Sequence, residues 1–189
     1  MCRIQSVKLA YKIRKIAEKE ILIRYTTILL KEILRNKNLD EVFQGGMSSI
    51  LLFEMVCFFF QRYYNEYLVD LNNNEDKIKN NITSLGHFFF KFLEYYSTIF
   101  DYRESKINLQ KGGGIIKEKY WKTDAELNVI DVTNDDNNLG KYCFEYDKIK
   151  RLFNKMYLFI RNSPINTIQS YLYPYINKKD MDVVVTDEE

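Results

Sequence analysis

The sequence has few of the residues that build disulfide-stapled or metal-bound domains. It contains one histidine, and its three cysteines lie far apart at Cys2, Cys57 and Cys143. An odd number of cysteines with no CxxC pair supports neither a disulfide framework nor a zinc site. This cysteine usage indicates a reducing compartment.

Long apolar runs are also lacking. The longest, from Met47 to Phe60, contains Glu54 and is shorter than the roughly 20 residues that span a bilayer. The N-terminus does not show the charged, apolar and small-residue segments of a signal peptide. We therefore expect no membrane attachment and predict a buried helix over the apolar run.

What the sequence does have is enough apolar material for a folded core. Of 189 residues, 46% are hydrophobic and 15% aromatic, which excludes a disordered tail and suits one domain. Residues 1–38 are rich in Lys and Arg, whereas the extreme C-terminus is acidic. A basic start suits a phosphate-bearing partner, although a solvated helix face is the simpler explanation from charge alone.

Apolar periodicity predicts a mainly α fold (α+β). Helices are predicted over about 5–35, 48–71, 84–99 and 146–161, and Ser163-Pro164 can open a short last helix. Ser84 is the expected N-cap of the third helix. Alternating residues near 106–110 and 127–131, with Gly112–Gly114 as a turn, predict a small β-ribbon at about 106–131.

Three segments in order carry a family resemblance. The first comprises LLKEILR at 29–35 and LDEVFQGGMSS at 39–49, and it resembles "LVLKQFL…LNEVFTGGLSSY". The second, LGHFFFKFLEYY at 85–96 followed by FDY at 100–102, is similar to "LG…LLLdFFefYG…FdY". The third joins Gly112-Gly113, VIDVTNDDNNLGK at 129–141 and IKRLF at 149–153, and it resembles "DGG", "DPLDPNNNVGR" and the helix that follows.

These motifs are typical of noncanonical poly(A) polymerases of the nuclear RNA-surveillance (TRAMP) type. The resemblance covers about residues 6–175. It implies the helical central domain of a polymerase-beta-like nucleotidyltransferase over 1–177, with a PAP-associated core at about 83–145 and an acidic tail at 178–189. It also implies that this domain closes over a nucleotide while a separate catalytic domain supplies the carboxylates.

The resemblance assigns phosphate-binding roles to three residues. Lys31 matches the triphosphate-binding lysine, and Arg35, one helical turn later, lies where relatives often keep a second basic residue. Ser49 matches the triphosphate-binding serine, at a helix N-terminus whose free N–H groups attract anions. Without the resemblance, the basic pair is an ordinary helix face and Ser48 simply caps the helix.

Base recognition is expected from the loop at 131–141. Its amides at Asn137 and Asn138 can donate to and accept from a base edge, although a polar surface turn is the alternative. Two positions depart from the family pattern. Ile50 replaces a tyrosine that stacks on the base, and Val132 replaces the proline of the family's Asp-Pro.

Catalytic residues are not expected on this chain. The only Asp-x-Asp, Asp180-Met-Asp182, follows the last helix and has no Gly-Ser before it. We therefore predict an ATP-binding half of an RNA 3′-end poly(A) polymerase that is inactive alone, with Mg²⁺ expected only alongside the missing catalytic domain. The resemblance implies a nuclear location, an RNA 3′ end as substrate, and a zinc-knuckle RNA-binding subunit and a helicase as partners. The alternatives are a non-catalytic scaffold that docks RNA-processing partners and a uridylyltransferase fragment.

Overall fold

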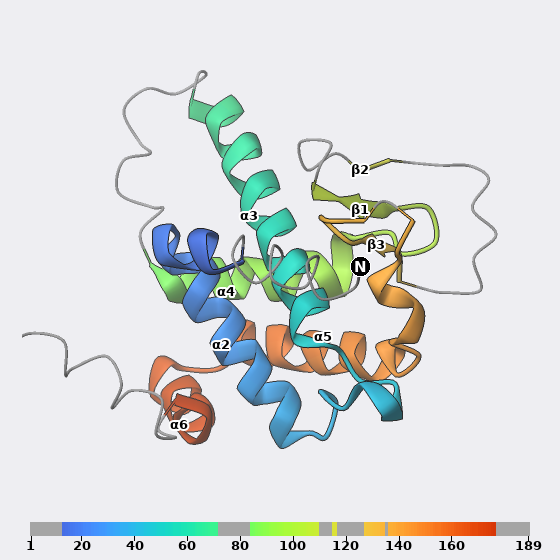
Figure 1. Cartoon of the computed structure of the whole chain (residues 1–189). Helices are drawn as coiled ribbons and strands as arrows, with labels where there is room; N and C mark the ends of the chain where they lie inside the picture. Colours follow the sequence, from blue (N-terminus) through green and yellow to red (C-terminus); the bar gives the residue numbers. More distant parts are fainter. Residues whose placement is uncertain (1–12, 72–83, 110–114, 117–126, 135, 177–189) are drawn as a thin grey trace, which may run out of the picture.

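The computed structural model describes residues 13–71, 84–109, 115–116, 127–134 and 136–176. Helices dominate it, and a small sheet lies at one side of them (Figure 1). In chain order the elements are α2 (Ile21–Asn36), η1 (Val42–Gln44), α3 (Ser49–Leu71), α4 (Leu85–Glu94), η2 (Tyr95–Ile99), β1 (Lys106–Asn108), β2 (Ile115–Ile116), β3 (Val129–Ile130), η4 (Leu139–Tyr142), α5 (Tyr146–Asn162) and α6 (Ile165–Ile176). The predicted mainly α fold is confirmed.

The N-terminal helical segment is divided, whereas the sequence predicts one helix over about 5–35. Residues 13–19 are helical, Glu20 is extended at φ −116° and ψ 91°, and α2 follows. Glutamate is a good helix former, so nothing local signals this interruption. The first part of the predicted helix, residues 5–12, lies outside the described residues.

Aromatic rings fill the core between α3 and α4. Phe59 of α3 lies 5.1 Å from the ring of Phe88 and 5.7 Å from that of Phe92, both on α4. Such edge and tilted contacts add to the free energy of burying each ring. The run from Met47 to Phe60 is buried as predicted, except that Ser48, Ser49, Ile50 and Phe60 are at least partly accessible. None of the described helices is both long enough and apolar enough to cross a bilayer.

Helix α4 begins at its predicted cap and ends in a π-helical turn. The N–H of His87 donates to Ser84 Oγ at 3.0 Å, which confirms the N-cap. In η2 the chain widens, and the N–H of Phe100 donates to the carbonyl of Tyr95 at 2.8 Å. The Tyr96 hydroxyl donates to the Met55 carbonyl at 2.8 Å, which fixes this turn against α3.

The three short strands form a sheet in the order β2-β1-β3. Strands β1 and β2 are antiparallel, with Lys106 opposite Ile116, as expected for a ribbon. Strand β3 is parallel to β1, with Ile107 opposite Val129, which a simple ribbon does not predict. The predicted turn at Gly112–Gly114 and the tail after residue 176 lie outside the described residues.

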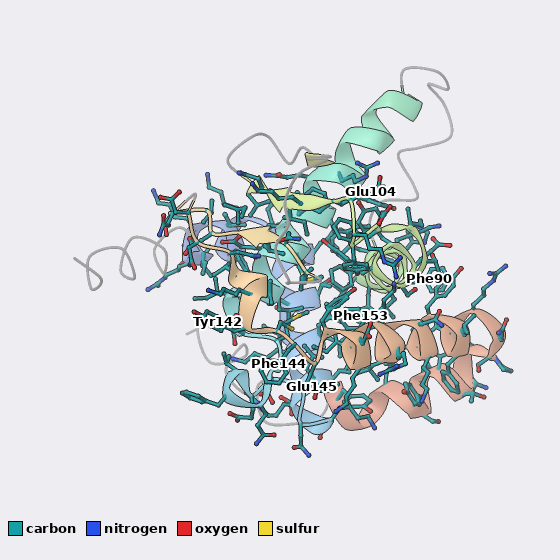
Figure 2. All side chains as sticks on the ribbon, turned by 90° about the vertical axis from the view of Figure 1, so that its right-hand side faces the viewer. Phe90, Glu104, Tyr142, Phe144, Glu145 and Phe153 are labelled. Carbon is teal, nitrogen blue, oxygen red and sulfur yellow. The ribbon has the colours of Figure 1, made fainter. Side chains whose placement is uncertain are left out.

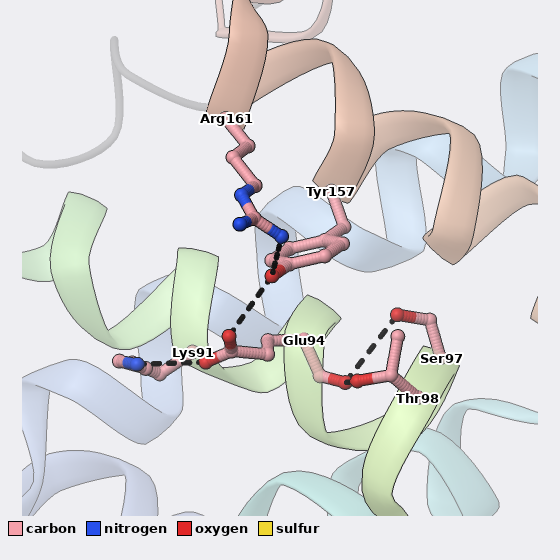
Figure 3. A network of polar contacts seen from close by, with 6 residues as sticks. All are labelled: Lys91, Glu94, Ser97, Thr98, Tyr157 and Arg161. Atoms are coloured by element: carbon pink, nitrogen blue, oxygen red, sulfur yellow. Dashed lines mark hydrogen bonds and ion pairs between the residues drawn. The ribbon is translucent and has the colours of Figure 1, made fainter.

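A polar network joins α4 to α5 on the surface (Figure 3). Glu94 accepts from Lys91 Nζ at 2.7 Å and from the Tyr157 hydroxyl at 2.9 Å. Arg161 Nη1 in turn donates to the Tyr157 oxygen at 3.3 Å. These contacts, chiefly the one from Lys91, hold the pKa of Glu94 below its usual range. The network therefore adds polar contacts to the packing between α4 and α5, whose first residues adjoin the candidate site.

Candidate functional site

The turn before α3 depends on two glycines. Gly45 has a left-handed φ of 82°, and the ring of Phe144 occupies the place that a Cβ would need. A Cβ on Gly46 would come within 2.6 Å of the Leu39 carbonyl oxygen. Only glycine permits both the positive φ and this close approach. The turn therefore packs closely against the residues that follow α2 and those that precede α5.

The N-terminus of α3 is capped by Ser48, as the structural alternative predicts. Ser48 Oγ accepts from the N–H of Leu51 at 3.2 Å. Ser49 is exposed and is the first helical residue. Helix geometry leaves the N–H groups of Ser49 and Ile50 without an intrahelical acceptor, and the helix dipole makes this end partly positive.

The loop between β3 and η4 is built around Asp131. Its Oδ1 accepts from the N–H and the hydroxyl of Thr133, and its Oδ2 accepts from Asn137 Nδ2 at 3.0 Å. The N–H of Asp131 also donates to the carbonyl of Asn137. These contacts close the loop and hold the Asn137 amide by its nitrogen. Asn137 Oδ1 accepts no hydrogen bond from the residues that the structure describes.

Asn138 has a largely structural set of contacts. Its Oδ1 accepts from the N–H groups of Val129 at 3.1 Å and Gly140 at 3.0 Å, and its Nδ2 donates to Asn128 Oδ1 at 2.9 Å. The carbonyl oxygen is thus occupied by the protein. A base-recognition role for both asparagines stays a prediction, and Asn137 is the one with an acceptor to offer.

The α3 N-terminus and this loop meet at one pocket of about 170 Å³. Ser48, Asn137 and Asn138 are its polar lining side chains. The remaining lining residues are Val42, Gly46, Leu51, Leu139, Tyr142 and Cys143. A drug-sized ligand needs about 300 Å³ or more, so this pocket can hold one ring or phosphate group of a larger ligand.

Four of the predicted site residues do not line the pocket: Lys31, Arg35, Ser49 and Ile50. Lys31 is partly buried on α2 and forms no ion pair within the described part of the chain. Arg35 pairs with Glu32 at 2.8 Å and lies 3.6 Å from an Asp40 oxygen. Lys31 therefore has its charge available to an anion, whereas Arg35 is already engaged by carboxylates.

Glu54 is a site residue that the sequence does not single out, although it is the one charge within the apolar run. It is 1% exposed, and its Oε1 accepts from the N–H of Val132 at 3.0 Å. Its Oε2 is buried with no partner. Burial raises the pKa of Glu54 to about 7, the nearby Asp131 carboxylate adds to the rise, and the Val132 hydrogen bond opposes it.

The chemistry of the remaining groups is limited. Burial raises the pKa of the Cys143 thiol to about 12, so this pocket-lining cysteine is not a nucleophile at neutral pH. Cys57 is buried in α3 and forms part of the hydrophobic core. Within the described ranges no three His, Cys, Asp or Glu side chains are grouped so that they could hold a metal ion. Asp180 and Asp182 lie outside those ranges.

Comparison with known proteins places these features in context. Residues 84–138 match the family model described as Cid1 family poly A polymerase. The chain is 30% identical over 161 residues to Poly(A) RNA polymerase gld-4 of Caenorhabditis elegans, an alignment that covers 82% of this chain and 18% of that protein. The chain thus spans less than a fifth of this relative's length.

Two solved structures share the fold. The first, from a study of the structural basis for the activity of a cytoplasmic RNA terminal U-transferase, has a TM-score of 0.66 and 18% identity and covers 82% of this chain and 58% of that chain. The second, the polymerase core of TRAMP, an RNA surveillance complex, has a TM-score of 0.59 and 17% identity and covers 95% and 52%. The family match, the sequence similarity and the shared fold together support a relationship between this chain and the noncanonical poly(A) polymerases.

Proposed function

We propose that this chain is the nucleotide- and RNA-binding half of an RNA 3′-end nucleotidyltransferase that uses ATP. The observation that carries the proposal is the pocket shared by Ser48 and Asn137. These residues are far apart in the sequence, so only the tertiary fold brings a helix N-terminus and a polar loop together. A nucleotide needs one group that binds its phosphates and another that recognises its base edge. The helix N-terminus can serve the first purpose, and the Asn137 amide the second.

Each group has a distinct part in this proposal. The N–H groups at the start of α3 and the hydroxyl of Ser49, which do not line the pocket, would meet phosphate oxygens outside it. The ammonium of Lys31 would supply the compensating charge. Asn137 Oδ1 would accept from an exocyclic amine, which adenine has and uracil does not. Ile50 would pack against a base without offering an aromatic face.

Catalytic chemistry would come from residues elsewhere. Metal-assisted phosphoryl transfer needs clustered carboxylates, and the described residues do not fit a magnesium ion. A nuclear location, a zinc-knuckle RNA-binding subunit and a helicase belong to the same proposal, and they rest on the resemblance of the sequence motifs to the surveillance-type polymerases.

RNA has a suitable surface beside the pocket. Val42, Phe43, Tyr142 and Phe144, which we call the aromatic rim, are 40%, 99%, 60% and 71% exposed. Figure 2 shows Tyr142 and Phe144 close to each other near the start of α5. Bases stack on aromatic side chains such as the three rings of this rim, and each stacking contact contributes about 1–3 kcal/mol to binding. On α5, Arg151 is exposed, makes no ion pair with any described residue, and can meet phosphates.

A uridylyltransferase is the second candidate, because the U-transferase structure has the higher TM-score of the two. The Asn137 oxygen can accept from the exocyclic amine of adenine or from the N3–H of uracil, so the two candidates are separated by measured base preference.

The test is a titration of the isotope-labelled chain with millimolar ATP and UTP, followed by NMR. Since a pocket of this size contacts only part of a nucleotide, binding should be weak, and NMR detects weak binding. ATP should shift the resonances of Ser49, Asn137 and their neighbours. Lys31→Ala should weaken binding about tenfold, the value of one charge-assisted contact. Lys155→Ala, an exposed lysine on α5, is the control. Shifts scattered over the surface, or equal loss in both variants, would contradict the proposal.

A further inference from the structure

One buried contact ties the nucleotide-facing loop to α3. The carboxyl of Glu54 lies one helical turn after Leu51, which lines the pocket. It accepts from the N–H of Val132, 78 positions away, at 3.0 Å. Val132 directly follows Asp131, the residue whose carboxylate holds Asn137. The position of the pocket loop thus depends on a helix side chain buried behind it.

Burial and the neighbouring acidic groups favour the neutral form of Glu54 and outweigh the Val132 N–H, which favours the carboxylate. The carboxylate of Asp131 faces it from the loop, and the Cys57 thiol faces it from the next turn of α3. No lysine or arginine of the described residues pairs with it. A negative charge on Glu54 would therefore be buried beside another negative charge, with its Oε2 unpartnered.

We propose that Glu54 is a positioning residue whose protonated carboxyl holds the loop residues 131–134 and 136–138 against α3, and whose loss of the proton releases them from the pocket. The consequence for nucleotide affinity rests on the proposed function. The anchoring of the loop does not.

Proton linkage gives the direction in which pH changes the packing of the loop. In a released loop Glu54 meets water and returns to its ordinary pKa near 4.5, whereas in the packed loop its pKa is about 7. The packed form therefore binds the proton more tightly, and packing weakens as pH rises from the lower value to the higher. Between about pH 5 and about pH 8 the opening equilibrium should increase about tenfold or more.

Amide hydrogen exchange on the full chain tests the anchoring without any ligand. After correction for intrinsic exchange, protection of the Val132 and Asn137 amides should fall about tenfold or more between about pH 5 and about pH 8. Glu54→Gln keeps the acceptor oxygen and cannot ionise, so its protection should be high and independent of pH. A flat profile in the unsubstituted chain, or the same fall in Glu54→Gln, would overturn the proposal.

A second pair of variants separates anchoring from general stability. Val132→Pro removes the donating N–H, whereas Val132→Ala keeps it. Protection of Asn137 should therefore fall at all pH values in Val132→Pro and follow the unsubstituted profile in Val132→Ala. Equal protection in both variants would overturn the anchoring role. Glu54→Leu should lower the protection of Asn137 at all pH values, as Val132→Pro does. If protection is kept in Glu54→Gln and lost in Glu54→Leu, the acceptor oxygen is the atom that anchors the loop.

ATP titration supplies the functional readout. ATP affinity should fall with pH more steeply in the unsubstituted chain than in Glu54→Gln. The variant is the necessary reference, because phosphate groups themselves titrate near neutral pH. The exchange profiles can be as expected while neither the unsubstituted chain nor Glu54→Gln binds ATP. That result would support the anchoring of the loop by Glu54 and contradict the proposed nucleotide site. If both bind ATP with the same pH profile while the loop opens, the loop does not govern binding.

Discussion

At the residue scale, the constraint at Gly140 shows how tightly the pocket loop is built. A Cβ there would overlap the carbonyl oxygen of Leu127, a backbone atom that has no rotamer to change. The glycine N–H also donates to Asn138 Oδ1, which holds η4 against β3. Small size at this position therefore determines whether the loop can close over the sheet.

We expect Gly140→Ala to destabilise the protein by on the order of 2 kcal/mol or more, because the backbone must move to relieve the overlap. Urea unfolding followed by circular dichroism measures the difference. Gly86→Ala is the matched control. Its new Cβ would be 3.9 Å from the nearest atom, Ser84 Oγ, at an exposed helical position. Alanine there should be neutral or stabilising by up to about 1 kcal/mol. Similar losses in the two variants would show that Gly140 is not constrained.

At the element scale, the α4–α5 network makes a polar contribution to a mostly aromatic interface. The Tyr157 hydroxyl both donates to Glu94 and accepts from Arg161. The ring itself packs on Phe90 with centroids 5.2 Å apart. Removing only the hydroxyl therefore separates hydrogen bonding from packing.

Tyr157→Phe should lower the free energy of unfolding by about 1–3 kcal/mol, the range for a hydrogen bond to a charged group. The loss should be largest at neutral pH, where Glu94 is ionised. It should shrink as the carboxyl is protonated in acid, because the pKa of Glu94 is lowered in the folded protein. Tyr171→Phe is the control, since that ring packs on Phe159 and its hydroxyl has no described hydrogen bond. A pH-independent loss in Tyr157→Phe would exclude the ionic contact as its cause.

Apolar periodicity in the sequence predicts some of these elements and not others. It predicts α3, α4 and α5 closely, because Phe88, Phe92 and Phe153 recur on the faces that become buried. It does not predict the extended Glu20, the π turn from Tyr95 or the parallel pairing of β3 with β1. These features depend on contacts such as that of Tyr96 with Met55, which join residues distant in the sequence.

At the scale of the whole molecule, local patterns alone do not define the site. Ser48 and Asn137 meet only in the fold, and the resemblance, rather than the residues themselves, links the two segments. Capping by Ser48 is predictable from local chemistry. The use of Asn138 as an internal brace is not, because its partners on β3 and η4 become known only once the sheet forms.

We expect that the purified chain does not extend RNA. The described residues provide no carboxylate cluster for a metal-assisted transfer. Incubation with an oligoadenylate primer, ATP and Mg²⁺ should leave the primer unchanged on a sequencing gel. Addition of even a few nucleotides by protein free of contaminating polymerase would contradict this expectation and direct attention to residues outside the described ranges.

The aromatic rim gives a prediction that does not depend on catalysis. If bases stack on it, Phe43→Ala should weaken binding of a fluorescent oligoadenylate about fivefold or more, as loss of about 1 kcal/mol or more requires. Phe43 is 99% exposed, so the substitution removes a contact surface and leaves the core intact. Leu158→Ala is the control, since Leu158 is 44% exposed on α5 outside the rim.

Arg151→Ala should instead reduce the salt dependence of binding, because a phosphate contact releases counterions and a stacking contact does not. Unchanged RNA affinity in Phe43→Ala, with protein-partner binding lost, would identify the rim as a protein-docking surface.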